Sequence, residues 1–306
     1  MNLRDRVREI PWKTLATYAL VVLIVLYMLA PFAWLVISSF MTEAEANSVP
    51  THFLPQQPTL NNYLVFFFPQ TYGAQSGGSH QTMTRAAVAG RAPERLPRSI
   101  ANSAVVACTA TLVNLVFGSM AAYSFARLRF RGSRPLMIGY LITRMVPLIT
   151  IIIPIFVVVQ RLHMGDSLLT LAILEAAASL PFSVWILKSY FQTIPRDLED
   201  AARVDRCNWL QMMFRVFLPL ARPGLASAGI CCFIWAWQDF LGALILTNTM
   251  ASKTAPTVVA EFVSMMDIER SLLVTAGVLA VIPPVVMALL FQRLIVQGLV
   301  AGAIKG

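Results

Sequence analysis

Six long apolar segments constrain the fold of this 306-residue chain more than any other feature of its sequence. A bilayer core about 30 Å thick takes roughly 20 apolar helical residues, and a helix satisfies all of its own backbone polar groups there. The predicted spans are Thr14–Phe40, Ser99–Ala126, Pro135–Gln160, Ser167–Leu187, Pro223–Thr249 and Ser271–Gln292. The sequence therefore predicts an all-α membrane protein with six transmembrane helices.

The composition supports a membrane protein over a soluble one. Hydrophobic residues make up 57% of the chain and charged residues only 13%, about half of the roughly 25% that is typical of soluble domains. The net charge of +9 is compatible with nucleic-acid binding. In a membrane protein, however, basic residues gather in cytoplasmic loops. We therefore expect contact with lipid and none with nucleic acid. The four cysteines and three histidines form no metal-ligand spacing, so no metal site is predicted.

The distribution of basic residues predicts the orientation. If the N-terminus is inside, the inside set is Arg4, Arg6, Arg8, Lys13, Arg127, Arg129, Arg131, Arg134, Lys188, Arg196, Arg203, Arg206, Arg215, Arg222, Arg293 and Lys305. The outside set is shorter and comprises Arg85, Arg91, Arg95, Arg98, Arg161, Lys253 and Arg270. By the positive-inside rule, both termini are expected in the cytoplasm of a bacterium, with the chain in the inner membrane.

This topology divides the chain into predicted regions. The first span follows a basic stretch, but it is too long for a signal peptide and no small-residue cleavage site follows it, so it is expected to stay as an anchor. The regions are a cytoplasmic N-terminus at 1–13, the first helix at 14–40, an outside loop at 41–98 with a flexible insertion near 70–95, a five-helix core at 99–292 that includes a cytoplasmic loop at 195–222, and a cytoplasmic tail at 293–306.

The loop at 195–222 is predicted to form two short helices. Pro195 suits the start of the first helix, and Asn208 can cap the second. Pro219 is expected to end the second helix. Residues at helical spacing give that helix one apolar stripe: Trp209, Met212, Met213, Val216 and Phe217. The pattern fits a helix lying on lipid headgroups as well as one seated in a groove of a partner protein.

The same loop resembles the EAA loop of ABC-importer permeases, whose pattern is Glu-Ala-Ala, three residues, Gly, nine residues and Ile-x-Leu-Pro. The resemblance implies that this loop couples the chain to an ATPase through Asp200, Ala201, Ala202, Asp205, Arg206, Val216, Leu218 and Pro219. Two positions depart from the pattern. Asp200 keeps the charge of the glutamate, but Arg206 replaces the glycine. A side chain at positive φ costs about 1 kcal/mol or more.

Other segments resemble the carbohydrate branch of these permeases. They are Ala121–Arg127 with Phe130–Gly132, Arg144–Pro147, Trp237–Phe240 and Gly298–Gly306. The resemblance implies the ABC type I importer permease fold. It also implies a second homologous permease, two copies of a nucleotide-binding ATPase subunit and a periplasmic solute-binding protein as partners. ATP and Mg²⁺ are then expected on the ATPase and no cofactor on this chain, since none of its lysines lies in a Gly-Lys-Ser/Thr phosphate loop.

Three ionisable residues fall inside predicted spans, where charge is costly: Arg144, Glu175 and Asp239. With the polar Asn114 and Gln238 they can line the pathway of a hydroxyl-rich solute. They can equally be structural, with Arg144 paired to Glu175 and Asp239 joining helices. A third reading is an ion-coupled secondary transporter that uses the three charges. No inverted repeat or broken-helix pair is evident to support it, and no catalytic constellation indicates an enzyme.

Overall fold

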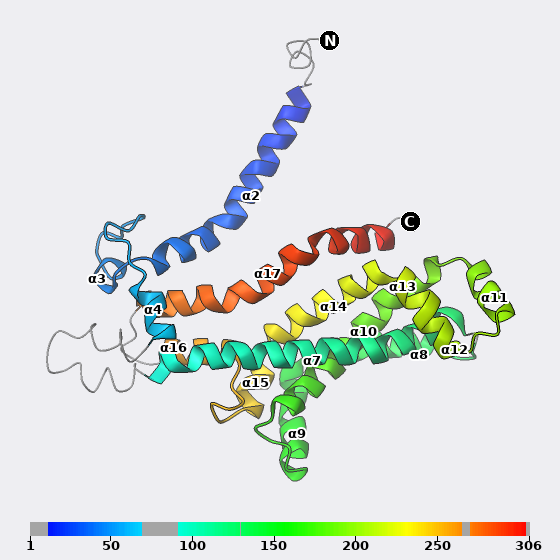
Figure 1. Cartoon of the computed structure of the whole chain (residues 1–306). Helices are drawn as coiled ribbons and strands as arrows, with labels where there is room; N and C mark the ends of the chain where they lie inside the picture. Colours follow the sequence, from blue (N-terminus) through cyan, green and yellow to red (C-terminus); the bar gives the residue numbers. More distant parts are fainter. Residues whose placement is uncertain (1–11, 69–90, 129, 265–269, 304–306) are drawn as a thin grey trace. The chain divides into compact units, whose positions relative to one another are not determined.

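The computed structural model describes residues 12–68, 91–128, 130–264 and 270–303, and every regular element within them is a helix (Figure 1). The chain forms two compact units. One contains residues 1–90 and 265–279, and the other contains residues 91–264 and 280–306. The predicted insertion near 70–95 falls mostly outside the described residues, as does most of the predicted N-terminal region at 1–13.

The first unit contains α2 (Trp12–Ser39), α3 (Glu43–Ala46), α4 (Asn61–Phe67) and the beginning of α17 (Arg270–Ala303). The carboxylate of Glu43 accepts hydrogen bonds of 3.0 Å from the backbone amides of Arg270 and Ser271. A carboxylate at a helix N-terminus satisfies free amides and favours the positive end of the helix dipole. Glu43 therefore fixes the start of α17 within this unit.

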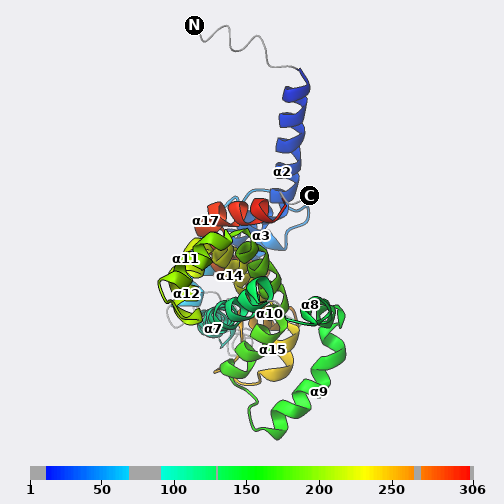
Figure 2. The same ribbon diagram turned by 90° about the vertical axis from the view of Figure 1, so that its right-hand side faces the viewer.

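The second unit is built around three helices that pack against one another: α7 (Arg91–Arg127), α10 (Leu168–Thr193) and α14 (Arg222–Trp237) (Figures 1 and 2). Small residues permit close approach of the helices. A Cβ atom on Gly224 of α14 would lie 2.4 Å from the ring of Tyr190 on α10. Any larger residue at Gly224 would therefore force the two helices apart.

Four helices are long and apolar enough to cross a membrane, at Thr14–Ser39, Glu94–Arg127, Leu168–Thr193 and Arg270–Leu294. They match the predicted first, second, fourth and sixth spans. Two further helix pairs pass the same test together but are sharply bent, Ser133–Met145 with Leu148–Arg161 and Trp209–Leu220 with Arg222–Trp237. The described residues therefore hold four spans, or six if each bent pair is one span.

The predicted third span is not one continuous helix. It consists of α8 (Ser133–Ile142), the 3₁₀ turn η1 (Thr143–Met145) and α9 (Leu148–Arg161), with a bend of 92°. Pro147 disfavours a helical conformation at the residue before it, and Val146 is extended with ψ 118°. The expectation that the chain lacks a broken-helix pair is therefore wrong.

The predicted fifth span is also interrupted. The helix α14 ends at Trp237, α15 (Leu241–Leu246) follows after a three-residue break, and α16 (Ala255–Ser264) comes next. Asp239 lies in that break and accepts hydrogen bonds from the amides of Gly242 and Ala243 at 3.2 and 3.0 Å. A polar residue that satisfies the first amides of the following helix allows this break inside an apolar segment.

Candidate coupling segment and polar clusters

The segment 195–222 forms two short helical pieces, as predicted. The first is α11 (Arg196–Val204), preceded by Pro195. The second begins with α12 (Trp209–Met212), where the Asn208 side chain accepts from the Gln211 amide at 2.8 Å and the Gln211 side chain accepts from the Asn208 amide at 3.0 Å. This reciprocal capping box fixes the start of the second piece.

The second piece ends close to the predicted proline. It continues from α12 through a π turn, η2 (Met213–Phe217), into α13 (Leu218–Leu220). Pro219 has no amide hydrogen and its ring crowds the carbonyl four residues earlier, and the wider π turn relieves that crowding. The helix therefore runs one residue past Pro219 before it breaks at Ala221.

The turn between the two pieces keeps a glycine-type backbone without a glycine. Arg206 has a φ of +58°, in the left-handed region that costs a side-chain-bearing residue about 1–2 kcal/mol. Its amide donates to the Arg203 carbonyl at 3.0 Å, and the Cys207 amide donates to the Ala202 carbonyl at 3.0 Å. The two hydrogen bonds close the end of α11. The turn therefore forms with arginine in place of the pattern's glycine, at the cost of backbone strain.

The apolar stripe predicted on the second helix faces inward. Met212, Met213 and Phe217 are buried against residues of α7 and α10. The Phe217 ring packs edge-on against Tyr123 and Phe191, with ring centroids 5.0 and 5.6 Å apart. The expectation that the stripe rests on lipid or in a partner's groove is therefore wrong for these three residues.

Other apolar residues of the segment are exposed, together with Trp209 of the predicted stripe. The exposed set is Leu198, Val204, Trp209, Leu210, Phe214 and Leu220. Val204 is 83% exposed and Phe214 is 64% exposed, although both belong to a segment whose other residues are anchored to the bundle. We call these six residues the exposed face. Hydrophobic side chains gathered on a firmly held segment are typical of a protein–protein contact.

The residues matched to the EAA pattern divide between the two sides of the segment. Ala202 is buried, and Val216 and Leu218 are partly buried. The other five are exposed: Asp200, Ala201, Asp205, Arg206 and Pro219. The pattern therefore contains residues that hold the segment to the bundle and residues that are free to meet another chain.

Arg127, which the charge distribution predicts only as a cytoplasmic loop charge, is buried beneath this segment. Arg127, the last residue of α7, donates from Nη2 to the carbonyl of Phe191 at 2.7 Å and to the carbonyl of Ile194. Its Nε lies 3.8 Å from Glu199 Oε2 on α11, and its guanidinium lies 5.0 Å from the Phe217 ring centre. We call this group the Arg127 cluster. Its signal in the sequence is an arginine that closes a long apolar helix.

Asn114, a predicted pathway residue, joins two helices. It is fully buried on α7, and its amide nitrogen donates to Ala110 and Ala176 carbonyls at 3.1 Å and to the Ser179 hydroxyl at 2.9 Å. Asn114 Oδ1 is buried without a hydrogen-bond partner. The donor side of the amide thus holds α7 to α10.

The three charged pathway candidates lie near one another. The carboxyl groups of Glu175 and Asp239 are close enough to interact electrostatically. Glu175 is buried, and among the described residues its Oε2 has no hydrogen-bond partner. Among the residues that the structure describes, no ion pair joins Arg144 to Glu175. The Arg144 guanidinium instead lies 4.3 Å from the ring centre of Trp235. Gln238, next to Asp239, is exposed.

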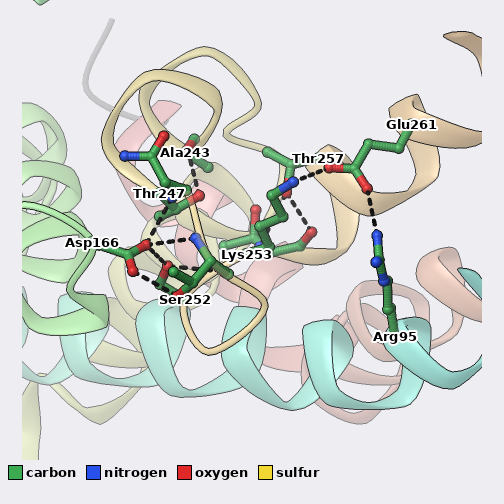
Figure 3. Close-up of polar contacts among 11 residues, drawn as sticks. Arg95, Asp166, Ala243, Thr247, Ser252, Lys253, Thr257 and Glu261 are labelled. Atoms are coloured by element: carbon green, nitrogen blue, oxygen red, sulfur yellow. Dashed lines mark hydrogen bonds and ion pairs between the residues drawn. The ribbon is translucent and has the colours of Figure 1, made fainter. Parts of the chain in front are cut away.

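A second polar cluster lies at the opposite end of α7. Asp166, between α9 and α10, accepts hydrogen bonds from the Asn248 amide at 2.7 Å, the Thr249 amide at 2.9 Å, the Thr249 hydroxyl at 2.6 Å and the Ser252 hydroxyl (Figure 3). Burial opposes the charged form, but these hydrogen bonds outweigh it and hold the pKa of the Asp166 carboxyl well below its usual value. Asp166 therefore fixes the loop after α15.

The same loop is tied to α7. Asn102 donates to the carbonyls of Ala251 and Lys253 at 3.1 and 2.9 Å, and the Ala255 amide donates to the Ser103 hydroxyl at 2.8 Å. Lys253 pairs with Glu261 on α16, and Glu261 lies 3.7 Å from Arg95 (Figure 3). We call these contacts, with those of Asp166, the Asp166 cluster.

A bundle of long apolar helices that holds a short two-helix segment with an exposed apolar face is typical of a membrane-embedded subunit that meets another protein. Comparison with known families is more specific. Residues 114–300 match the family described as binding-protein-dependent transport system inner membrane component. The chain belongs to that family and is a permease subunit of an ABC transporter, an inner membrane component.

Two relatives match nearly the whole chain, and a third matches about two thirds of it. The inner membrane ABC transporter permease protein YcjP of Escherichia coli strain K12 is 32% identical over 289 residues, which is 94% of this chain and 95% of that protein. The trehalose/maltose transport system permease protein MalG of Thermococcus litoralis is 31% identical over 93% of this chain and 94% of its own. The trehalose transport system permease protein SugB of Mycobacterium tuberculosis is 39% identical over 68% of this chain and 77% of its own.

A solved structure has the same fold. It belongs to a bacterial ABC transporter involved in the import of the acidic polysaccharide alginate. The match has a TM-score of 0.72 at 19% identity and covers 96% of this chain and 98% of that chain. The predicted importer-permease fold is therefore confirmed.

Proposed function

We propose that this chain and a second, homologous permease form the translocation pathway for a carbohydrate or polyol that a periplasmic binding protein delivers. Two copies of an ATPase subunit, which carry ATP and Mg²⁺, drive the cycle through the segment 195–222. The proposal rests on one observation: the segment has a buried side packed on the membrane helices and an exposed apolar side. Its inner side is anchored among α7 and α10, while its exposed face is apolar.

The exposed face fits a groove on a partner protein. Val204, Trp209 and Phe214 offer large apolar area, and aromatic residues such as Trp209 and Phe214 are enriched in protein interfaces. The exposed acidic and basic motif residues around them, Asp200, Asp205 and Arg206, then supply a polar rim. The inner anchoring allows a push on this face to reach the membrane helices.

Two exposed valines give a matched test of the contact. Val204, on the exposed face, is 83% exposed, and Val49, in the loop before α4, is 95% exposed. When the chain is co-expressed with the ATPase subunit from its own genome, we expect Val204→Asp to reduce co-purification of the ATPase at least tenfold. Val49→Asp should leave it unchanged. Equal recovery of the ATPase with both variants would refute the assignment of the segment.

The same valines test the proposed orientation. With both termini in the cytoplasm, Val204 lies inside and Val49 outside. In a cysteine-free background, a membrane-impermeant maleimide applied to spheroplasts should label Val49→Cys at once and Val204→Cys only after permeabilisation. Labelling in the reverse order would overturn the orientation that the basic residues predict.

The proposed substrate class rests on the relatives and on the polar residues of the membrane region. Relatives of similar length carry names that refer to trehalose, maltose and sulfoquinovosyl glycerol. Arg144 stacked on Trp235 and the exposed Gln238 offer an aromatic face and polar groups, which together suit a hydroxyl-rich solute. Glu175, Asp239 and Asn114 would line or support the same pathway.

A transport assay with separated readouts tests the pathway. In proteoliposomes that contain the full complex and its binding protein, Gln238→Ala and Arg144→Ala should lower uptake of the bound sugar at least fivefold. Recovery of the ATPase subunit should not change, because neither residue lies on the segment 195–222. Uptake within twofold of wild type in both variants would remove these residues from the pathway.

One observation favours an ion-coupled carrier as the second candidate. The carboxyl groups of Glu175 and Asp239 interact electrostatically beside a broken helix, an arrangement that ion-coupled carriers also use. This alternative predicts uptake by the purified chain alone that a protonophore abolishes. The ABC importer predicts no uptake without ATPase and binding protein.

A further inference from the structure

The Arg127 cluster lies where three parts of the bundle meet. Arg127 closes α7, the carbonyls of Phe191 and Ile194 end α10, and Glu199 belongs to α11 of the segment 195–222. The Arg127 side chain is only 4% exposed and that of Glu199 is 9% exposed. A buried guanidinium needs partners for its donors, and the two carbonyls at the end of α10 and the nearby carboxylate are the groups available to it.

The geometry leaves one hydrogen bond unmade. Among the residues that the structure describes, Arg127 Nε is buried without a hydrogen-bond acceptor, and its distance of 3.8 Å to Glu199 Oε2 is too long for a hydrogen bond. Nη2 already serves the end of α10. A displacement of α11 towards α7 by roughly 1 Å would bring Nε and the carboxylate within hydrogen-bonding distance. The interaction energy of the cluster therefore depends on where α11 lies.

We infer that Arg127 is the positioning residue that transmits displacement of α11 to α7 and α10. The inference rests on the proposed function, since it requires an ATPase that moves the segment. Arg127 itself is beneath the segment and not on its exposed face, so it acts after the contact with the partner. The Phe217 ring, 5.0 Å below the guanidinium, holds the side chain in the position that reaches both helices.

Arg203 provides a matched control. It pairs with the same carboxylate, Nη2 to Glu199 Oε1 at 2.7 Å, but its side chain is 63% exposed and its contact stays within α11. Replacement of Arg203 takes away one positively charged partner of Glu199 and leaves the contacts to α7 and α10 unchanged. If the Arg127 and Arg203 variants differ in stimulation of ATP hydrolysis, the difference comes from the contact between α11 and the helices α7 and α10. It does not come from the loss of a charged partner of Glu199.

The test uses the full complex in proteoliposomes with the loaded binding protein. We expect Arg127→Gln to leave co-purification of the ATPase subunit within twofold of wild type and to reduce stimulation of ATP hydrolysis by the binding protein about tenfold. Arg127→Lys, which keeps the charge but cannot reach the two α10 carbonyls and Glu199 together, should retain part of the stimulation. Arg203→Gln should retain stimulation within twofold. In combination with Glu199→Gln, Arg127→Gln should cause no further loss, because the two residues act as one unit.

Each outcome decides between the two proposals. If wild type neither recovers an ATPase subunit nor shows stimulation, the proposed function and this inference both fail. If wild type is coupled but Arg127→Gln behaves like Arg203→Gln, only the inference fails. Loss of assembly in both Arg127→Gln and Arg127→Lys would show that Arg127 serves folding alone and would also overturn it.

Discussion

The two ends of α7 are held in opposite ways. At its last residue, Arg127 is buried among ring carbons and backbone carbonyls, with a single carboxylate nearby. Near its first turns, Asn102 and Arg95 join a network of loops and partly exposed ion pairs centred on Asp166 and Glu261. Burial protects the first cluster from solvent, whereas pH and salt reach the second. The stability contributed by the Asp166 cluster should therefore depend on pH and salt, and that contributed by the Arg127 cluster should not.

The largest expected effect comes from the apolar side of the Arg127 cluster. Phe217 is fully buried and touches two rings and the guanidinium. Phe217→Ala leaves a cavity and should cost about 3–5 kcal/mol of stability. Thermal unfolding of the purified chain in detergent measures the loss. The neighbouring exposed ring gives the control, since Phe214→Ala should change stability by less than about 1 kcal/mol. Equal effects would mean that the stripe does not face inward.

The next effect belongs to the Asp166 cluster and depends on pH. The folded-state pKa of Asp166 is lowered, so the stability that this carboxylate contributes is fully present above its unfolded pKa of about 4 and is lost as pH falls towards the folded value. The melting temperature of the wild type should therefore fall between about pH 5 and pH 3. The melting temperature of Asp166→Asn should fall less over the same range. Parallel pH profiles of the two proteins would contradict the hydrogen bonds drawn in Figure 3.

The sequence predicted these two ends unequally for a physical reason. Hydropathy and charge counts depend on long segments, so four spans, the capping residue Asn208 and the two-piece segment were found. The carboxylate of Asp166 and the loop at 248–252 are more than 80 residues apart, and no local pattern reports such a contact. Breaks in apolar segments were missed as well, because Pro147 and Asp239 lie in stretches whose average hydropathy remains high. The direction of the 209–217 stripe could not be read either, since a lipid, a partner and the chain's own bundle all select apolar residues.

The turn of the segment 195–222 gives a smaller effect of opposite sign. Replacement of Arg206, at φ +58°, by glycine relieves about 1–2 kcal/mol of backbone strain and adds roughly 0.5–1 kcal/mol of unfolded-state entropy. Arg206→Gly should therefore raise stability by about 0.5–1 kcal/mol in the same thermal assay. Arg206→Ala keeps a Cβ atom at this φ and should give no such gain. A gain with alanine equal to that with glycine would locate the effect in the arginine side chain and not in the backbone.

The smallest expected effect separates the two clusters by their response to salt. Lys253, Glu261 and Arg95 have side chains between 22% and 31% exposed, and exposed ion pairs contribute about 0.2–1 kcal/mol that dissolved ions screen. A rise in NaCl from about 50 to 500 mM should lower the wild-type melting temperature slightly, and Glu261→Gln should remove most of this dependence. Glu199→Gln should lower the melting temperature at every salt concentration yet keep the same salt dependence, because ions do not reach the buried Arg127–Glu199 pair. If Glu199→Gln also abolished the salt dependence, solvent would have to reach Arg127, and the contrast between the two ends of α7 would be lost.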